Sequence, residues 1–276
     1  MIEIDWSTYF NKLFPNIGSM YFTEREMKAV NKKLYERNER LLISEEQYPT
    51  CIYDLMARIV HPGIGSIREK AVAIGLLTSI DGAIDKLSEL MLGDTFLLSQ
   101  LKKQLKDLFN DNEAKYMEKI GELFASIHLI ESYPSYTLRS LEYKYERING
   151  KISNKGKDAD LYFQGTNIEN SILIDVVNIS LDYKRIENDT GLETILSDRI
   201  RSKIQTKRFD DKDVIKYYEK AMIQPFLWVF DWDTILKYKN SLKKTHFSNS
   251  LPILLMTQQT DASGSLSYKC TSVNEL

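Results

Sequence analysis

Three aspartates stand in or beside two short apolar segments near the middle of the chain. Asp158 and Asp160 open the segment KDADLYF, and Asp175 lies inside SILIDVVNIS. A buried carboxylate is strongly destabilising unless it is paired, hydrogen-bonded or bound to a cation. The position of Asp175 therefore predicts a compensating group, and carboxylate oxygens on neighbouring segments are typical ligands of Mg²⁺ or Mn²⁺.

The two segments have the pattern of an antiparallel hairpin. Facing residues in such a pair have numbers with a constant sum, so a turn centred near Asn167-Ile168 places Asp160 roughly opposite Asp175. The two carboxylates then share one face and form an oxygen-rich site. An acidic residue at a strand end is also commonly solvated or paired with Lys or Arg, and this interpretation stays open. If the two acids share a cation site, Asp175→Asn is expected to leave the fold intact and to weaken divalent-ion binding strongly. Because close carboxylates repel, it is also expected to raise thermal stability in metal-free buffer.

Helical periodicity dominates the chain up to about residue 135. Helices are expected at residues 23–43, 51–60, 67–92, 97–109 and 112–133. The third of these is either continuous or broken near Gly82, and the last begins at Asn112 and carries Glu122.

Beyond Pro134 the hydrophobic period becomes two, which is typical of strands. Strands are expected at residues 138–148, 159–163, 171–180, 225–232, 251–258 and 266–273, and helices at about 190–208 and 213–222. This order predicts an α/β (α+β) fold with a mixed sheet flanked by helices. We expect a helical region over 1–112, for recognition or interaction, and an α/β domain over 113–276.

The composition is that of an ordinary globular protein, with 43% hydrophobic and 28% charged residues. The net charge of -2 argues against a wholly basic nucleic-acid binder but permits a local basic groove. Cys51 and Cys270 have no metal-ligand spacing, which argues against a disulfide framework or a structural zinc site. No apolar run approaches the roughly 20 residues that span a bilayer, and the first residues lack a signal-peptide layout. We therefore expect a soluble, cytoplasmic protein with no membrane partner.

The order of elements and the acidic positions resemble the PD-(D/E)xK superfamily, the restriction-endonuclease-like nucleases. The resemblance covers about residues 114–258 and implies a helix, a three-stranded meander, a second helix and a further strand. KDADLYF carries the family's first acid, at Asp160 with Asp158 as its neighbour, and ILIDVVN carries the second, at Asp175. GELFA places Glu122 where the family's helix acid lies. The resemblance implies that these carboxylates bind Mg²⁺ or Mn²⁺.

The chain departs from the family at the lysine. That residue should follow the second acid by two positions, where this chain has Val177, and Ala159 precedes the first acid instead of a proline. In the family the lysine helps to activate the attacking water and stabilises charge on phosphate, a role that Val cannot fill. Some members supply the lysine from the following helix, where Lys203 and Lys207 share one face. A solvated helix face is the alternative interpretation of these two residues, and Lys184 is a further candidate.

The resemblance implies a metal-dependent endonuclease that hydrolyses phosphodiester bonds. Its partner would be nucleic acid, DNA above all, and its role restriction or defence against mobile DNA. A divergent member that has lost catalysis and binds nucleic acid or protein is the alternative, and an unrelated α/β protein with solvated acids is a third interpretation. The N-terminal helices carry no motif for chemistry and suit target recognition, or the interface of a homodimer or a partner subunit.

Overall fold

The structure is a computed structural model. It describes residues 6–43, 51–60, 65–109, 116–148, 151–153, 155–166, 170–181, 186, 188–228, 232–244, 247–260, 262 and 264–276. The expected turn at Asn167-Ile168, the expected helix start at Asn112 and the candidate Lys184 lie outside the described residues.

The chain divides into two compact units. The helical unit comprises Met1–Gly93, Leu101–Leu123 and Gln258–Lys269, and the α/β unit comprises Asp94–Gln100, Phe124–Thr257 and Cys270–Leu276. Residues 113–123 and 258–269, which we expected in the α/β domain, therefore cluster with the helical unit.

Seven helices make up the described N-terminal part of the chain. They are α1 (Trp6–Leu13), α2 (Pro15–Tyr21), α3 (Glu24–Ile43), α4 (Ile52–Val60), α5 (Ile67–Leu90), α6 (Thr95–Leu108) and α7 (Tyr116–Ser132). The helix α5 runs unbroken through Gly82 and opens with a capping box, in which the Ser66 hydroxyl accepts from the Glu69 amide at 3.2 Å. The Glu69 carboxylate accepts from the Ser66 amide at 2.6 Å in return, so two amides that a helix start leaves unpaired are satisfied.

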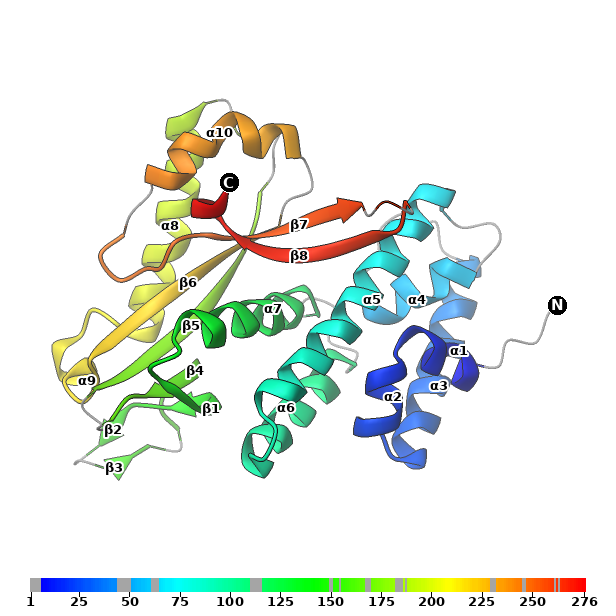
Figure 1. Cartoon of the computed structure of the whole chain (residues 1–276), viewed down its shortest axis with the longest axis horizontal. Helices are drawn as coiled ribbons and strands as arrows, with labels where there is room; N and C mark the ends of the chain where they lie inside the picture. Colours follow the sequence, from blue (N-terminus) through cyan, green and yellow to red (C-terminus); the bar gives the residue numbers. More distant parts are fainter. Residues whose placement is uncertain are drawn as a thin grey trace. The chain divides into compact units, whose positions relative to one another are not determined.

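A six-stranded sheet runs in the order β1-β4-β5-β6-β7-β8 (Figure 1). Its strands are β1 (Thr137–Lys144), β4 (Asp158–Gln164), β5 (Ser171–Ser180), β6 (Lys220–Trp228), β7 (Leu254–Thr260) and β8 (Leu266–Ser272). The first three form an antiparallel meander, β6 then pairs in parallel with β5, and β7 pairs in parallel with β6. The short strands β2 (Arg147–Ile148) and β3 (Lys151–Ile152) pair separately. The predicted α/β fold class is confirmed.

Three further helices belong to the α/β unit. They are α8 (Asp189–Lys207), α9 (Lys212–Ile215) and α10 (Trp232–Lys244), and the single turn η4 (Val273–Glu275) ends the chain. Four residues of α8 at four-residue spacing are fully or nearly buried, namely Leu192, Leu196, Ile200 and Ile204. This stripe packs α8 against β5 and β6, along which it runs in Figure 1. The apolar core between helix and sheet thereby fixes which face of α8 meets the strands.

Two sequence predictions for the α/β unit need correction, and one helix was missed. The helix expected at 213–222 ends at Ile215, because residues from Lys220 onward pair with β5 as the start of β6. The strand expected at 138–148 breaks after Lys144. The helix α10 was not predicted. Pairing with a buried neighbouring strand overrides the local helical preference at 220–222.

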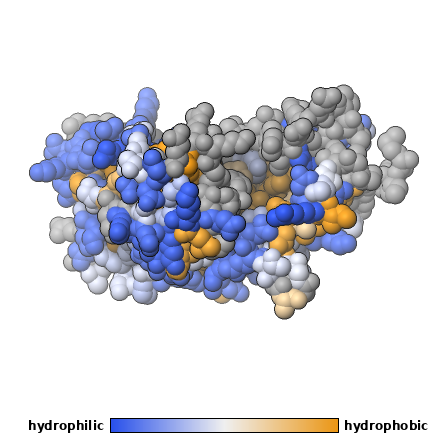
Figure 2. Space-filling view, turned by 90° about the horizontal axis from the view of Figure 1, so that it is seen from above, coloured by the Kyte–Doolittle hydropathy of each residue, from blue (hydrophilic) through white to orange (hydrophobic). Residues whose placement is uncertain are grey.

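The face of the molecule seen in Figure 2 is mostly polar where the structure is described. Figure 2 shows hydrophilic side chains over most of the visible described area, with apolar side chains in small separate areas. Single exposed apolar residues are normal on a folded protein. Among the described helices, none is long and apolar enough to cross a membrane.

Candidate acid–lysine site

The β4–β5 hairpin brings Asp160 and Asp175 to neighbouring positions. Leu161 faces Ile174 and Tyr162 faces Leu173, so the same register places Asp160 opposite Asp175. A carboxylate oxygen of Asp160 accepts a hydrogen bond from the main-chain amide of Val176 at 2.7 Å. The alignment that the sequence predicted for the two acids is therefore the one that the strands adopt.

Asp175 is completely buried and is compensated by two lysines from α8. One carboxylate oxygen lies 2.9 Å from the ammonium nitrogen of Lys203, and the other contacts the ammonium group of Lys207. Neither contact is a well-directed hydrogen bond, so the carboxylate is held by charge. Breaking a buried ion pair of this kind by removing one partner usually costs ~3–5 kcal/mol. The compensating group that the position of Asp175 required is thus a pair of ammonium groups.

Asp158 extends the same network toward the surface. Its main-chain carbonyl accepts from the ammonium group of Lys207 at 2.6 Å, and its carboxylate lies 3.3 Å from that group. The other carboxylate oxygen of Asp158 accepts from Lys144 at 3.1 Å. The side chain of Asp158 is 46% exposed and that of Asp175 is 0% exposed. Lys207 therefore bridges an accessible carboxylate and a buried one.

The charges of the cluster shift the pKa of Lys207 and that of Asp158 toward their ionised forms. Burial alone would lower the pKa of Lys207, but the charges of Asp175 and Asp160 outweigh burial and raise that pKa. Burial would likewise raise the pKa of Asp158, and the hydrogen bond from Lys144 with the charge of Lys207 lowers it instead. Three carboxylates thus lie among three ammonium groups, and their formal charges cancel.

The position that should hold the family's lysine is filled by packing. Val177 is 9% exposed and belongs to the apolar core that the stripe of α8 covers. Lys203 and Lys207 lie beside that stripe on α8, and the ammonium groups of both contact Asp175. The apolar side chain of Val177 provides no such charge. The two lysines are therefore brought to Asp175, as the relocated-lysine hypothesis required, while their catalytic role stays a prediction.

Glu122 is placed differently. It lies on α7 within the segment Leu101–Leu123 of the helical unit, whereas Asp158, Asp160 and Asp175 belong to the α/β unit. Its carboxylate accepts from Lys119 on the same helix at 2.8 Å. Its expected role as a further metal ligand stays a prediction.

Two residues of the cluster were missed by the sequence analysis. Lys144 faces Asp158 across β1 and β4, and the neighbouring Tyr145 donates from its hydroxyl to the main-chain carbonyl of Lys207. The register of β1 against β4 is the signal that would have found Lys144, but β1 contains an irregularity between Leu138 and Ser140 that sequence spacing does not reveal.

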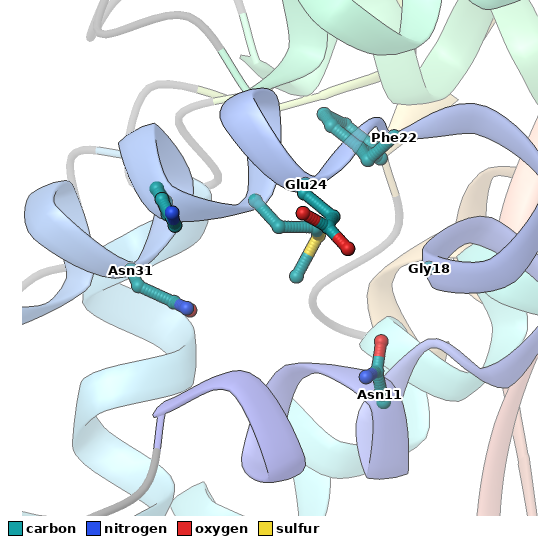
Figure 3. A pocket seen from close by; sticks show the side chains of 7 residues that line it. Asn11, Gly18, Phe22, Glu24 and Asn31 are labelled. Carbon is teal, nitrogen blue, oxygen red and sulfur yellow. The ribbon is translucent and has the colours of Figure 1, made fainter.

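A separate hollow of about 340 Å³ lies in the helical unit (Figure 3). It is lined by Asn11, Gly18, Phe22, Glu24, Met27, Lys28 and Asn31. Two amides, one carboxylate and one ammonium group make up its polar lining, without the paired acids that metal-dependent hydrolysis needs. This hollow therefore adds nothing to the chemistry of the acid–lysine site.

The comparisons with known proteins contribute no assignment. The chain matches no family model, no curated protein and no solved structure. Among the residues that the structure describes, no three His, Cys, Asp or Glu side chains gather as a metal-binding group. The functional argument therefore rests on the geometry of the acid–lysine site.

Proposed function

We propose that the α/β unit is a divalent-metal-dependent nuclease that hydrolyses phosphodiester bonds in nucleic acid, DNA above all. The observation that carries the proposal is the convergence of Lys203 and Lys207 on Asp175, across the hairpin from Asp160. Two acids on adjacent strands and a lysine beside them are the parts that the PD-(D/E)xK resemblance implies. The antiparallel meander followed by α8 and the parallel strand β6 supports the same comparison.

The donor atoms suit Mg²⁺ or Mn²⁺, since both ions prefer carboxylate oxygens. Asp158 and Asp160 would supply the first ligands, because the side chain of Asp158 is 46% exposed while that of Asp175 is 0% exposed. Asp175 would hold the lysines in place and complete the acidic set. A bound ion would acidify a water molecule and neutralise charge on the transferred phosphoryl group.

The two lysines would divide the work between them. The side chain of Lys203 is 30% exposed and that of Lys207 is 13% exposed. Lys203 is therefore the better placed to meet a phosphate from solvent and to stabilise its developing negative charge. Lys207, which contacts Asp158 and Asp175 together, would hold the two acids at a fixed separation.

One observation favours the alternative of a nuclease-fold protein that binds nucleic acid or protein without cleaving it. The formal charges of the acid–lysine site cancel without a metal ion, and Asp175 is closed off from solvent. Such a network would stabilise the fold even in the absence of catalysis. The proposed nuclease, in contrast, requires that Asp158 and Asp160 accept an ion while the lysines remain in place.

A cleavage assay separates the two candidates. The full chain would be incubated with single- and double-stranded DNA and RNA, with Mg²⁺, with Mn²⁺ or with EDTA. We expect metal-dependent cleavage, and we expect Lys203→Ala and Asp160→Asn each to reduce it by about 100-fold or more. Arg201→Ala is the matched control, because Arg201 is exposed on the same helix.

Circular dichroism would verify that each variant is folded. Absence of cleavage by the parent on all four substrates, with nucleic-acid binding retained, would replace the nuclease with the binding module. Cleavage that survives both substitutions would show that the reaction does not use this site. A role in restriction or defence against mobile DNA, and a cytoplasmic location, belong to the same proposal.

A further inference from the structure

Tyr145 connects the end of β1 to the end of α8. The residue is completely buried, and its hydroxyl donates a short hydrogen bond to the main-chain carbonyl of Lys207. Its ring packs against that of Phe209, with the ring centroids 5.4 Å apart. Its own carbonyl accepts from the Tyr218 hydroxyl at 3.1 Å. Contacts at the ring, the hydroxyl and the main chain therefore hold Tyr145 in one orientation.

The carbonyl that Tyr145 binds belongs to the last residue of α8. The last carbonyls of a helix have no partner within the helix, so an outside donor is needed when they are buried. Arg208 follows in the left-handed conformation, with φ 56° and ψ 35°, and ends the helix there. A residue other than glycine is strained in that conformation, so surrounding contacts must hold it.

The residue after Tyr145 supplies a second contact to the same turn. Glu146 accepts from the Arg208 guanidinium at 3.2 Å and from the main-chain amide of Lys157 at 2.9 Å. Two consecutive residues after β1 thus hold two consecutive residues at the end of α8. The turn that carries Lys207 is thereby fixed from the side of β1 and β4, the strands that also carry Lys144 and Asp158.

We infer that Tyr145 is a positioning residue for Lys207. Its hydroxyl fixes the last turn of α8, so that the Lys207 ammonium group stays between Asp158 and Asp175. A long lysine side chain has many conformations, and anchoring its main chain restricts where the ammonium group can lie. The catalytic consequence of this inference rests on the proposed nuclease function, but the positioning itself does not.

The hydroxyl remains a donor over the whole physiological pH range. Burial raises the pKa of Tyr145 far above its usual value, and the negative charges of Asp175, Glu146 and Asp158 raise it further. The phenol is therefore neutral, and its proton stays available to the Lys207 carbonyl.

The test compares Tyr145→Phe with Tyr53→Phe. Tyr145→Phe removes only the hydroxyl and keeps the ring against Phe209. Tyr53 is a matched control, because it is 1% exposed and its hydroxyl donates at 2.7 Å to the main-chain carbonyl of Phe109, just beyond the end of α6. Both substitutions therefore remove one buried hydroxyl from the end of a helix, and Tyr53 belongs to the helical unit.

The primary measurement is the rate at which an acylating reagent modifies each lysine of the full chain, followed by mass spectrometry. We expect Tyr145→Phe to raise the modification rate of Lys207 at least threefold, while the exposed Lys155 reacts as in the parent. Tyr53→Phe should leave Lys207 unchanged. An unchanged rate at Lys207 in Tyr145→Phe, or an equal rise at Lys119 in the helical unit, would overturn the positioning role.

The second measurement is the cleavage rate in Mg²⁺. With the proposed function correct, Tyr145→Phe should lower kcat about tenfold with little change in KM, because the substrate meets Lys203 and not Tyr145. Failure of the parent to cleave would count against the nuclease alone, since lysine modification still decides the positioning. If Lys207 becomes more reactive in Tyr145→Phe while kcat does not change, Tyr145 has a structural role only, and its proposed effect on catalysis is wrong.

Discussion

Two of the buried carboxylates, Asp175 in the α/β unit and Asp81 in the helical unit, are stabilised in opposite ways. Asp175 in β5 is 0% exposed and Asp81 in α5 is 4% exposed. Asp175 contacts two ammonium groups. Asp81 accepts from the main-chain amides of Asn16 at 3.2 Å and Ile17 at 3.1 Å, and from the Asn16 side-chain amide at 2.9 Å.

The two acids therefore have different kinds of partner. The amides that Asp81 binds lie in the first turn of α2, where main-chain amides have no partner within the helix, so Asp81 caps α2 from α5. Its partners carry no full charge, and burial raises the pKa of Asp81. The described partners of Asp175 are instead charged side chains, those of Lys203 and Lys207, and both are partly exposed. A buried acid that binds amides is a structural device, whereas one that holds two lysines beside further acids is a candidate for chemistry.

Removing a lysine from the acid–lysine site should produce the largest effect. We expect Lys207→Ala to lower the free energy of unfolding by ~3–5 kcal/mol, because it leaves a buried charge undercompensated. Lys203→Ala should cost less, since Lys203 is the more exposed of the two. Urea denaturation of the two variants and of Arg201→Ala measures the difference. Equal losses for Lys203 and Lys207 would contradict the division between an inner and an outer lysine.

Asparagine substitution should separate the two carboxylates. At Asp81 an asparagine keeps an acceptor oxygen for the amides of α2, so Asp81→Asn should recover much of the ~1–3 kcal/mol that Asp81→Ala costs. At Asp175 asparagine should recover little, because two buried ammonium groups would face a neutral amide. Thermal unfolding of the four variants tests this. Equal recovery at both positions would mean that charge does not distinguish the sites.

The pH dependence of Asp81 sharpens the same comparison. Because its pKa is raised on folding, the contribution of Asp81 to stability is fully present below the ordinary pKa and is lost as pH rises through the raised one. The asparagine in the Asp81→Asn variant does not titrate. The free energy of unfolding of the variant should therefore improve relative to that of the parent from pH 3.5 to pH 7. A constant difference, measured by urea denaturation at several pH values, would contradict the raised pKa.

The smallest effect should come from an ion pair near the surface of the helical unit. A side-chain hydrogen bond from Lys106, with the Thr23 amide, lowers the pKa of Glu26 to about 2. This contribution is present above the ordinary pKa and is lost as pH falls toward 2, the reverse of Asp81. The free energy of unfolding should therefore fall less between pH 5 and pH 3 in Glu26→Gln than in the parent. The difference should be no more than ~1 kcal/mol, because the pair is partly solvated. If parent and variant lose the same stability between pH 5 and pH 3, the Glu26–Lys106 pair does not contribute to acid sensitivity.

The sequence alone determined the main elements of the α/β unit and the pairing of its two central acids. The period of two over 159–163 and 171–180 produced β4 and β5, and the midpoint between them placed Asp160 opposite Asp175. The spacing of Lys203 and Lys207 placed them beside the apolar stripe of α8. These features were predictable because strand period, turn position and helical spacing depend on residues close together in the chain.

The tertiary structure alone decided how the charges meet. The sequence argument treated Asp160 and Asp175 as two repelling acids and expected Asp175→Asn to raise thermal stability in metal-free buffer. With two lysines on Asp175, we expect that substitution to lower it instead. Tyr145 contacts the end of α8 through its hydroxyl, and its ring packs against that of Phe209. Electrostatic and packing contacts of this kind join residues far apart in the chain, and their strength depends on burial, which no local pattern specifies.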